Sequence, residues 1–158
     1  RLKEIPGVKN LVVGIAWALT PTLLPVQFTP ICENLTSLIV GVYFFSLVFI
    51  NSVICDLRDI EGDAFSGVQT IPVILGAQKT KIILIGSNLF SGSMVLLLSV
   101  THISPTITCL LAIGIIYAHF YILFFDKASK TDILCDLVVD GQFIVLGGVM
   151  YIAINLMG

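Results

Sequence analysis

The residues best suited to chemistry form an acidic run directly after a long apolar stretch. From Asp56 to Asp63 the chain carries four acidic residues and one basic residue, a net charge of −3. Asp56, Asp59 and Asp63 are spaced i, i+3, i+7, so on a helix they would share one face and repel one another. A cation would relieve that repulsion, and an all-oxygen ligand set favours Mg²⁺ over zinc or copper. Because Mg²⁺ is usually held by one or two carboxylates plus substrate phosphates, the spacing suggests diphosphate binding at a membrane surface.

The acidic run also has a purely structural interpretation. Charges gather wherever a membrane span ends, so the acidic run alone is also typical of a solvated interfacial loop. The residues Asp132, Asp136 and Asp140 repeat a similar spacing, and by spacing alone they are an equally good metal motif. We interpret them as an interfacial helix leading into the last span, with Lys127 and Lys130 balancing the charge. Asp140 adjoins that span, where it would cap the helix or reach a cavity.

The elements that position these residues must be membrane helices. Of the 158 residues, 57% are hydrophobic and only 11% are charged, whereas soluble domains carry about 25% charged residues. This composition argues against a soluble globular domain, a disordered chain and a nucleic-acid binder, since no basic patch is present. The uncharged stretches predict an all-α polytopic bundle of about five spans, at residues 10–30, 36–55, 82–100, 105–125 and 138–157.

The basic residues predict how the bundle lies in the membrane. All eight Lys and Arg residues fall in three alternate connections, namely Arg1–Lys9, the loop 56–81 and Asp126–Asp140. Because basic residues concentrate on the cytoplasmic side, we expect these three segments to be cytoplasmic and the C-terminus to lie outside. Pro21 and Pro25 predict a kinked or shortened first helix.

Polar residues and glycines inside the spans have mostly structural interpretations. His119 has no second His or Cys at ligand spacing, so we expect it to make a hydrogen bond inside the bundle. Asn51 lies just before Asp56 and would line a cavity. We expect Gly41 and Gly147–Gly148 to permit close approach of helices, and the following to pack or to make helix–helix hydrogen bonds: Trp17, Asn88 and Gln142.

The acidic run belongs to a longer pattern. It reads Asp56-x-x-Asp59-x-x-x-Asp63-x-x-x-Gly67-x-x-Thr70-x-Pro72, followed by Leu75-Gly76. This pattern resembles the second aspartate-rich motif of the UbiA-type membrane prenyltransferases. In addition, Arg1-Leu2-Lys3, followed by Lys9-Asn10 at the opening of a span, resembles the family's segment before its fifth helix.

The resemblance implies a fold and an activity. In the family, nine helices surround a central cavity, and two aspartate-rich motifs bind Mg²⁺ and an isoprenyl diphosphate. The prenyl group is then transferred to an aromatic or lipid acceptor. The Ile60-Glu61-Gly62 form of the motif is somewhat similar to enzymes that prenylate a glycerol phosphate lipid, and a quinone-precursor aromatic is the next choice.

The resemblance also assigns roles to individual residues. Asp59 and Asp63 would hold Mg²⁺, and Asp56 would be a further ligand or an acceptor-side base. Three residues would bind substrate: Lys3 at the diphosphate, Asn51 in the cavity wall, and Arg58 at the diphosphate or at a phospholipid headgroup.

The family's first motif, N/D-x-x-x-D-x-x-x-D, is absent upstream of Asp56, and the chain begins with Arg1. We therefore expect this chain to be the C-terminal five of nine helices, with an N-terminal half elsewhere in the same protein. Such a chain would hold half of the active site and be inactive alone. The rival interpretation is a transporter segment or non-catalytic membrane subunit with an ion-binding acidic loop. It is disfavoured because the spans hold no ionisable residue except His119.

Overall fold

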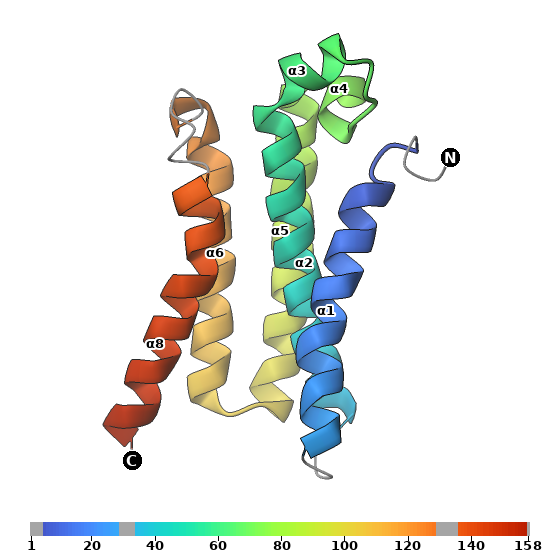
Figure 1. Cartoon of the computed structure of the whole chain (residues 1–158). Coiled ribbons are helices and arrows are strands. Elements are labelled where there is room, and N and C mark those ends of the chain that lie inside the picture. Colours follow the sequence, from blue (N-terminus) through green and yellow to red (C-terminus); the bar gives the residue numbers. More distant parts are fainter. Residues whose placement is uncertain (1–4, 29–33, 129–135, 158) are drawn as a thin grey trace.

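The computed structural model describes residues 5–28, 34–128 and 136–157, which form an all-helical bundle (Figure 1). The five long helices are α1 (Val8–Phe28), α2 (Asn34–Arg58), α5 (Ala77–His102), α6 (Pro105–Ala128) and α8 (Gly141–Met157). Two short helices, α3 (Ile60–Phe65) and α4 (Ile71–Leu75), connect α2 to α5. A π-helical turn, η2 (Asp136–Asp140), leads directly into α8.

The five expected spans coincide with the five long helices. Within the fully described residues, three segments are long and apolar enough to cross a membrane, namely Leu35–Arg58, Ala77–His102 and Pro105–Phe125. Val8–Thr20 and Leu137–Ile152 form shorter apolar stretches. The fold is therefore that of an integral membrane protein, as the composition predicts.

Helix α1 differs from expectation, because it continues through Pro21 and Pro25 to Phe28. Of the two expected alternatives, a shortened helix is not observed, and a kink stays a prediction. A proline removes one backbone donor, but in apolar surroundings ending the helix would leave many more groups without partners. In the same turn, the Thr22 hydroxyl adds hydrogen bonds within the helix, since Thr22 Oγ1 donates to the carbonyls of Ala18 and Leu19, both at 3.0 Å.

Helix α2 lies at the centre of the bundle and packs against α1, α5 and α6. Its inward face is almost fully buried, and it joins apolar side chains from α5 and α6 in one core cluster. This cluster includes Ile39, Leu47, Ile50 and Ile54 from α2, Leu84 and Val95 from α5, and Ala118 and Ile122 from α6. The central position matters for function because α2 carries Asn51 and Asp56.

Glycines set the closest helix contacts. A Cβ atom on Gly41 would lie 2.6 Å from Cγ2 of Thr22, and one on Gly92 would lie 2.6 Å from Cγ2 of Ile115. The prediction for Gly41 is confirmed. The one for Gly147–Gly148 is not, because no described atom lies within 4 Å of a Cβ built at either position.

Polar side chains in the bundle follow expectation only in part. Asn88 Nδ2 donates to the carbonyl of Ile115 at 3.1 Å and joins α5 to α6. Trp17 stacks on Phe143 with ring centroids 6.3 Å apart, so α1 meets α8. Gln142 is fully buried, yet neither end of its amide has a hydrogen-bond partner among the described residues, and the same holds for His119 Nδ1.

The two ends of the bundle differ in chemistry. The start of α1, the helices α3 and α4, and the first residues of η2 and α8 lie at one end, which we call the acidic end because it carries residues 56–63 (Figure 1). The C-terminus of α8 and the turn between α5 and α6 lie at the other end. This arrangement places the Lys9, Asp56 and Asp140 segments on one side, as the distribution of basic residues predicts.

Candidate functional site

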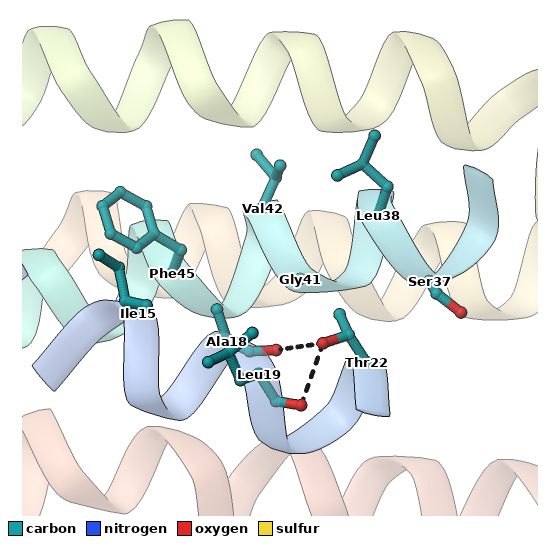
Figure 2. Close-up of a pocket in the computed structure, with 9 residues that line it drawn as sticks. All are labelled: Ile15, Ala18, Leu19, Thr22, Ser37, Leu38, Gly41, Val42 and Phe45. Carbon is teal, nitrogen blue, oxygen red and sulfur yellow. Dashed lines mark hydrogen bonds between the residues drawn. The ribbon is translucent and has the colours of Figure 1, made fainter. Parts of the chain in front are cut away.

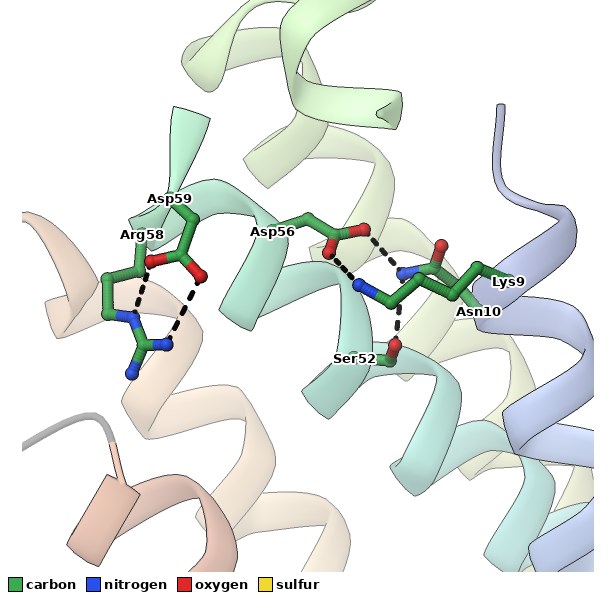
Figure 3. Close-up of polar contacts among 6 residues, drawn as sticks. All are labelled: Lys9, Asn10, Ser52, Asp56, Arg58 and Asp59. Atoms are coloured by element: carbon green, nitrogen blue, oxygen red, sulfur yellow. Dashed lines mark hydrogen bonds and ion pairs between the residues drawn. The ribbon is translucent and has the colours of Figure 1, made fainter. Parts of the chain in front are cut away.

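Asp56 is a buried carboxylate in the last turn of α2. Only 3% of the residue is exposed. Its Oδ1 atom accepts a hydrogen bond from Lys9 Nζ at 2.9 Å, and its Oδ2 atom accepts one from Asn10 Nδ2 at 2.8 Å (Figure 3). Asn10 Nδ2 also donates to Ser52 Oγ at 3.1 Å. The first turn of α1 thus neutralises and satisfies the carboxylate, as a buried charge requires.

Asp59 has the opposite surroundings. Its side chain is 52% exposed, and it accepts hydrogen bonds from Nε of Arg58 at 2.8 Å and from Nη2 at 3.2 Å. The Arg58 guanidinium, helped by the charge of Lys9, holds the pKa of Asp59 below its usual range. In Figure 3 the carboxylates of Asp56 and Asp59 point in different directions.

The chain changes helix between these two aspartates. Helix α2 ends at Arg58 and α3 begins at Ile60, with Asp59 between them at φ −90° and ψ 9°. The single shared face expected for the three aspartates is therefore not observed for Asp56 and Asp59. In the part of the chain that the structure covers, no group of three or more His, Cys, Asp or Glu residues is arranged to hold a metal ion.

Asp63 lies in α3 and is half-buried. Its carbonyl accepts a hydrogen bond from Val68 N at 2.9 Å, and Gly67 between them has φ +71°. This is the left-handed closure that commonly ends a helix and that favours glycine. Gly67 of the motif therefore has a structural role: it turns the chain back toward α4. The Asp63 carboxylate lies close enough to Lys9 for the two charges to interact.

A cavity of about 540 Å³ opens between α1, α2 and α8. Each wall is polar toward the acidic end and apolar one or two helical turns deeper. Helix α1 supplies Lys9, then Val13 and Trp17. Helix α2 supplies Cys55, then Ser52 and Asn51, then Val48, and the junction of η2 with α8 supplies Asp140, then Phe143. The cavity is therefore shaped for an amphiphile whose polar group lies near Lys9 and Asp140.

Asn51 lines this cavity, as expected, but its amide is already occupied. Asn51 Nδ2 donates to the carbonyl of Val139 at 3.1 Å, and its Oδ1 accepts a hydrogen bond from the hydroxyl of Tyr121. The residue joins α2, α6 and η2. A role for Asn51 in holding the cavity wall in place follows directly from these contacts.

A second hollow lies between α1 and α2, farther from the acidic end. It measures about 450 Å³ and contains no charged side chain (Figure 2). The Thr22 hydroxyl is turned to carbonyls of its own helix, and Ser37 Oγ has no hydrogen-bond partner. The groove is lined by Ile15, Ala18, Leu19, Thr22, Ser37, Leu38, Gly41, Val42 and Phe45. The described lining of this groove thus carries no charge that would attract an ion or a diphosphate.

Several of the sequence candidates meet at one place, and others fall outside the described residues. The structure brings Asp56, Asn51 and Asp140 near Lys9, Asn10 and Ser52, three residues that sequence reasoning did not assign to the site. The Lys9-Asn10 pair at the opening of the first span was the available signal. Lys3 and Asp132 lie outside the described residues, and the side chain of Asp136 is not described.

A model of the UbiA prenyltransferase family matches residues 1–147 of the chain. No curated protein and no solved structure gives a significant match. The matched range contains the whole acidic run, the first turn of α1 and the junction of η2 with α8.

Proposed function

Because the chain belongs to the UbiA prenyltransferase family, we propose that it takes part in Mg²⁺-dependent transfer of an isoprenyl group within the membrane. The donor is an isoprenyl diphosphate, and the acceptor is a lipid or an aromatic compound. This chain supplies one half of the active site, and an N-terminal half of the same protein supplies the other.

One observation carries the proposal. The acidic run, the Lys9 ammonium and the polar end of a mixed cavity all lie at the same end of the bundle. A prenyl donor needs this combination, because its diphosphate is highly charged while its chain is apolar. The three-helix cavity offers both environments within a few helical turns.

Asp59 and Asp63 are the residues that fit a magnesium ion. Both offer carboxylate oxygens, and neither is fully buried. The Asp59 oxygens are paired with Arg58 at the surface, and a metal ion would displace this exposed contact. Mg²⁺ is usually held by one or two carboxylates with phosphates and water, so the absence of a preformed three-carboxylate cage is compatible with this role. When bound, Mg²⁺ would act as a Lewis acid that neutralises charge on the departing diphosphate.

The surroundings of Asp56 support a positioning role for this residue. Both of its oxygens are engaged by Lys9 and Asn10, so it holds the first turn of α1 against α2 and keeps Lys9 at the opening of the cavity. Arg58 and Lys3 remain our candidates for contacts with the diphosphate. Asn51 maintains the cavity wall.

The apolar part of the cavity supports the rest of the reaction. An allylic cation formed when the diphosphate leaves must be kept from water until the acceptor attacks. Val13, Val48 and Phe143 exclude water from the deeper part of the cavity, and Trp17 presents a ring face there. Aromatic rings stabilise nearby cations.

The test is made in the protein at its full natural length, in its own membranes, with a radiolabelled isoprenyl diphosphate. Replacing Asp59 or Asp63 by Asn should lower Mg²⁺-dependent diphosphate release by on the order of 100-fold. Glu61→Gln removes a charge from the same segment and should leave the rate within about twofold. Near-normal rates in both aspartate variants would overturn the metal role. Ion binding without prenyl transfer by the wild type would favour the non-catalytic interpretation.

A further inference from the structure

Asp140 lines the cavity, but the proposed mechanism assigns no role to its carboxylate. It is exposed, it lines the cavity, and it makes no hydrogen bond or ion pair with any residue that the structure describes. It lies at the end of the π-helical turn η2, immediately before α8. An exposed charged side chain at the end of a membrane span usually has no fixed orientation. The contacts around η2 decide whether Asp140 has one.

Two neighbouring helices hold the turn that carries Asp140. The hydroxyl of Tyr117 in α6 donates to the carbonyl of Val138 at 2.8 Å. Asn51 in α2 donates to the carbonyl of Val139 at 3.1 Å, and Tyr121 fixes the Asn51 amide in turn. Single π-helical turns are rare and are frequently found at functional sites. Here side chains from outside the helix bind the two carbonyls that directly precede Asp140.

The direction of Asp140 follows from Phe143. The two residues are three apart, so they share a face of the helix, and both line the cavity. The Phe143 ring stacks on Trp17 at 6.3 Å and on Phe44 at 6.1 Å. This face of α8 therefore looks across the cavity at α1, and Asp140 lies one turn nearer the acidic end than the aromatic stack.

Among the described side chains, the charges at this end of the cavity do not cancel. Lys9 is the described cation that lines it, and Lys9 is paired at 2.9 Å with buried Asp56. Counting the three described groups Lys9, Asp56 and Asp140 gives a net charge of −1. A wall with a surplus carboxylate disfavours an anionic acceptor that brings no Mg²⁺ with it, unlike the diphosphate of the donor, and it accepts a hydrogen bond from a neutral hydroxyl group.

We propose that Asp140 binds the acceptor by accepting a hydrogen bond from a neutral hydroxyl group, while the apolar body of the acceptor packs on Trp17 and Phe143. The acceptor at this end of the cavity is thus a phenol or an alcohol and not a carboxylate or a phosphate. Naming the ligand as the acceptor rests on the proposed function, whereas the hydroxyl site itself does not.

Trp17 makes the site measurable without turnover. The fluorescence that is lost in a Trp17→Phe variant belongs to this residue, and bromine quenches indole fluorescence on contact. Three probes of similar size distinguish hydrogen-bond donation, apolar contact and anion binding at this site. The compound 4-bromophenol donates a hydrogen bond, 4-bromoanisole does not, and 4-bromobenzoate is an anion. Each is titrated into the detergent-solubilised protein at its full natural length, with a Trp17→Phe variant as the background.

The wild type should bind 4-bromophenol roughly tenfold more tightly than 4-bromoanisole, since a hydrogen bond to a charged group is among the stronger ones. Asp140→Ala should abolish this difference and strengthen the binding of 4-bromobenzoate. Glu61→Ala, which removes an exposed carboxylate outside the cavity, should change neither. An unchanged phenol preference in Asp140→Ala, or no preference in the wild type, would overturn the proposal.

The outcome is separable from that of the proposed function. The titration uses no isoprenyl diphosphate and no Mg²⁺. Asp140-dependent phenol binding in a protein without prenyl transfer would leave the hydroxyl site standing and remove only the enzymatic assignment. Normal transfer without phenol preference would remove the hydroxyl site alone.

Discussion

Asp56 and Asp59 are three residues apart in one motif, yet the two carboxylates meet opposite conditions. Asp56 is buried and depends on Lys9 and Asn10 for its charge to be tolerated. Asp59 is half in water and pairs with its neighbour Arg58. A buried charge that loses its partner is costly, whereas an exposed pair contributes little.

This difference gives a prediction for stability. Lys9→Met should lower the free energy of unfolding by about 1–2 kcal/mol, less than for a fully buried pair because water screens the exposed lysine. The matched change Lys79→Met removes an exposed lysine for which no ion pair is seen among the described residues, and it should cost less than about 0.5 kcal/mol. Thermal unfolding of the two variants in the same detergent measures the contrast. Equal losses would show that the Asp56 carboxylate is balanced in some other way.

At the scale of the helix, close packing depends on residues without side chains. Lipid is as apolar as the helix surfaces, so helices associate through van der Waals contact and interhelical hydrogen bonds. Gly92 lets α5 approach Ile115 of α6, and Asn88 supplies a hydrogen bond in the same contact. One turn of α5 thus provides both kinds of attraction.

Helix α5 contains its own control for this effect. Gly92→Ala and Gly86→Ala both gain helix propensity, about 1 kcal/mol each in an exposed position. At Gly92 the added methyl would lie 2.6 Å from Ile115 Cγ2, whereas at Gly86 it meets no described atom within 4 Å. We expect Gly86→Ala to raise the unfolding temperature and Gly92→Ala to lower it. The order of the two unfolding temperatures decides the point.

The π-helical turn η2 gives a second prediction at this scale. Tyr117→Phe removes the hydroxyl that binds the Val138 carbonyl and should destabilise the turn by about 1 kcal/mol. Amide hydrogen exchange in residues 136–143 should then become roughly fivefold faster. The control is Tyr151→Phe, at an exposed site on α8. Unchanged exchange in the first variant would mean that the turn does not depend on Tyr117.

At the scale of the whole molecule, the candidate functional residues lie at one end of the bundle. The helices α3 and α4, the first turn of α1 and the η2 turn converge there, while the other end holds the α5–α6 turn and the C-terminus (Figure 1). The basic residues predict that the acidic end is cytoplasmic. A soluble diphosphate would then reach Asp59 and Asp63 from the cytoplasm.

Two serines at opposite ends of the bundle can each be replaced by cysteine to test how the bundle is oriented in the membrane. Ser66 follows α3 and Ser104 precedes α6, and both are exposed. In intact cells, a membrane-impermeant maleimide should label Ser104→Cys at once and Ser66→Cys only after permeabilisation. The unsubstituted protein gives the background from its own cysteines. Labelling of Ser66→Cys in intact cells would reverse the orientation.

The sequence alone determined the membrane class, the five long helices, the side on which the charges lie and the resemblance to UbiA-type enzymes. These features depend on local quantities: apolar length sets a span, basic residues set its direction, and the motif from Asp56 to Gly76 is continuous in the chain. The path of α1 through Pro21 was not predictable in this way, because surroundings without water outweigh the local preference of proline.

Only the tertiary structure decided which side chains meet. Lys9 and Asp56 are 47 residues apart, and Asn51 and Val139 are 88 residues apart. Such contacts depend on which helices pack together and on their rotation, and spans of similar hydrophobicity carry little information about either. For the same reason Asp140, one of three aspartates equivalent by spacing, is assigned to the cavity by its position opposite Trp17 and not by its motif.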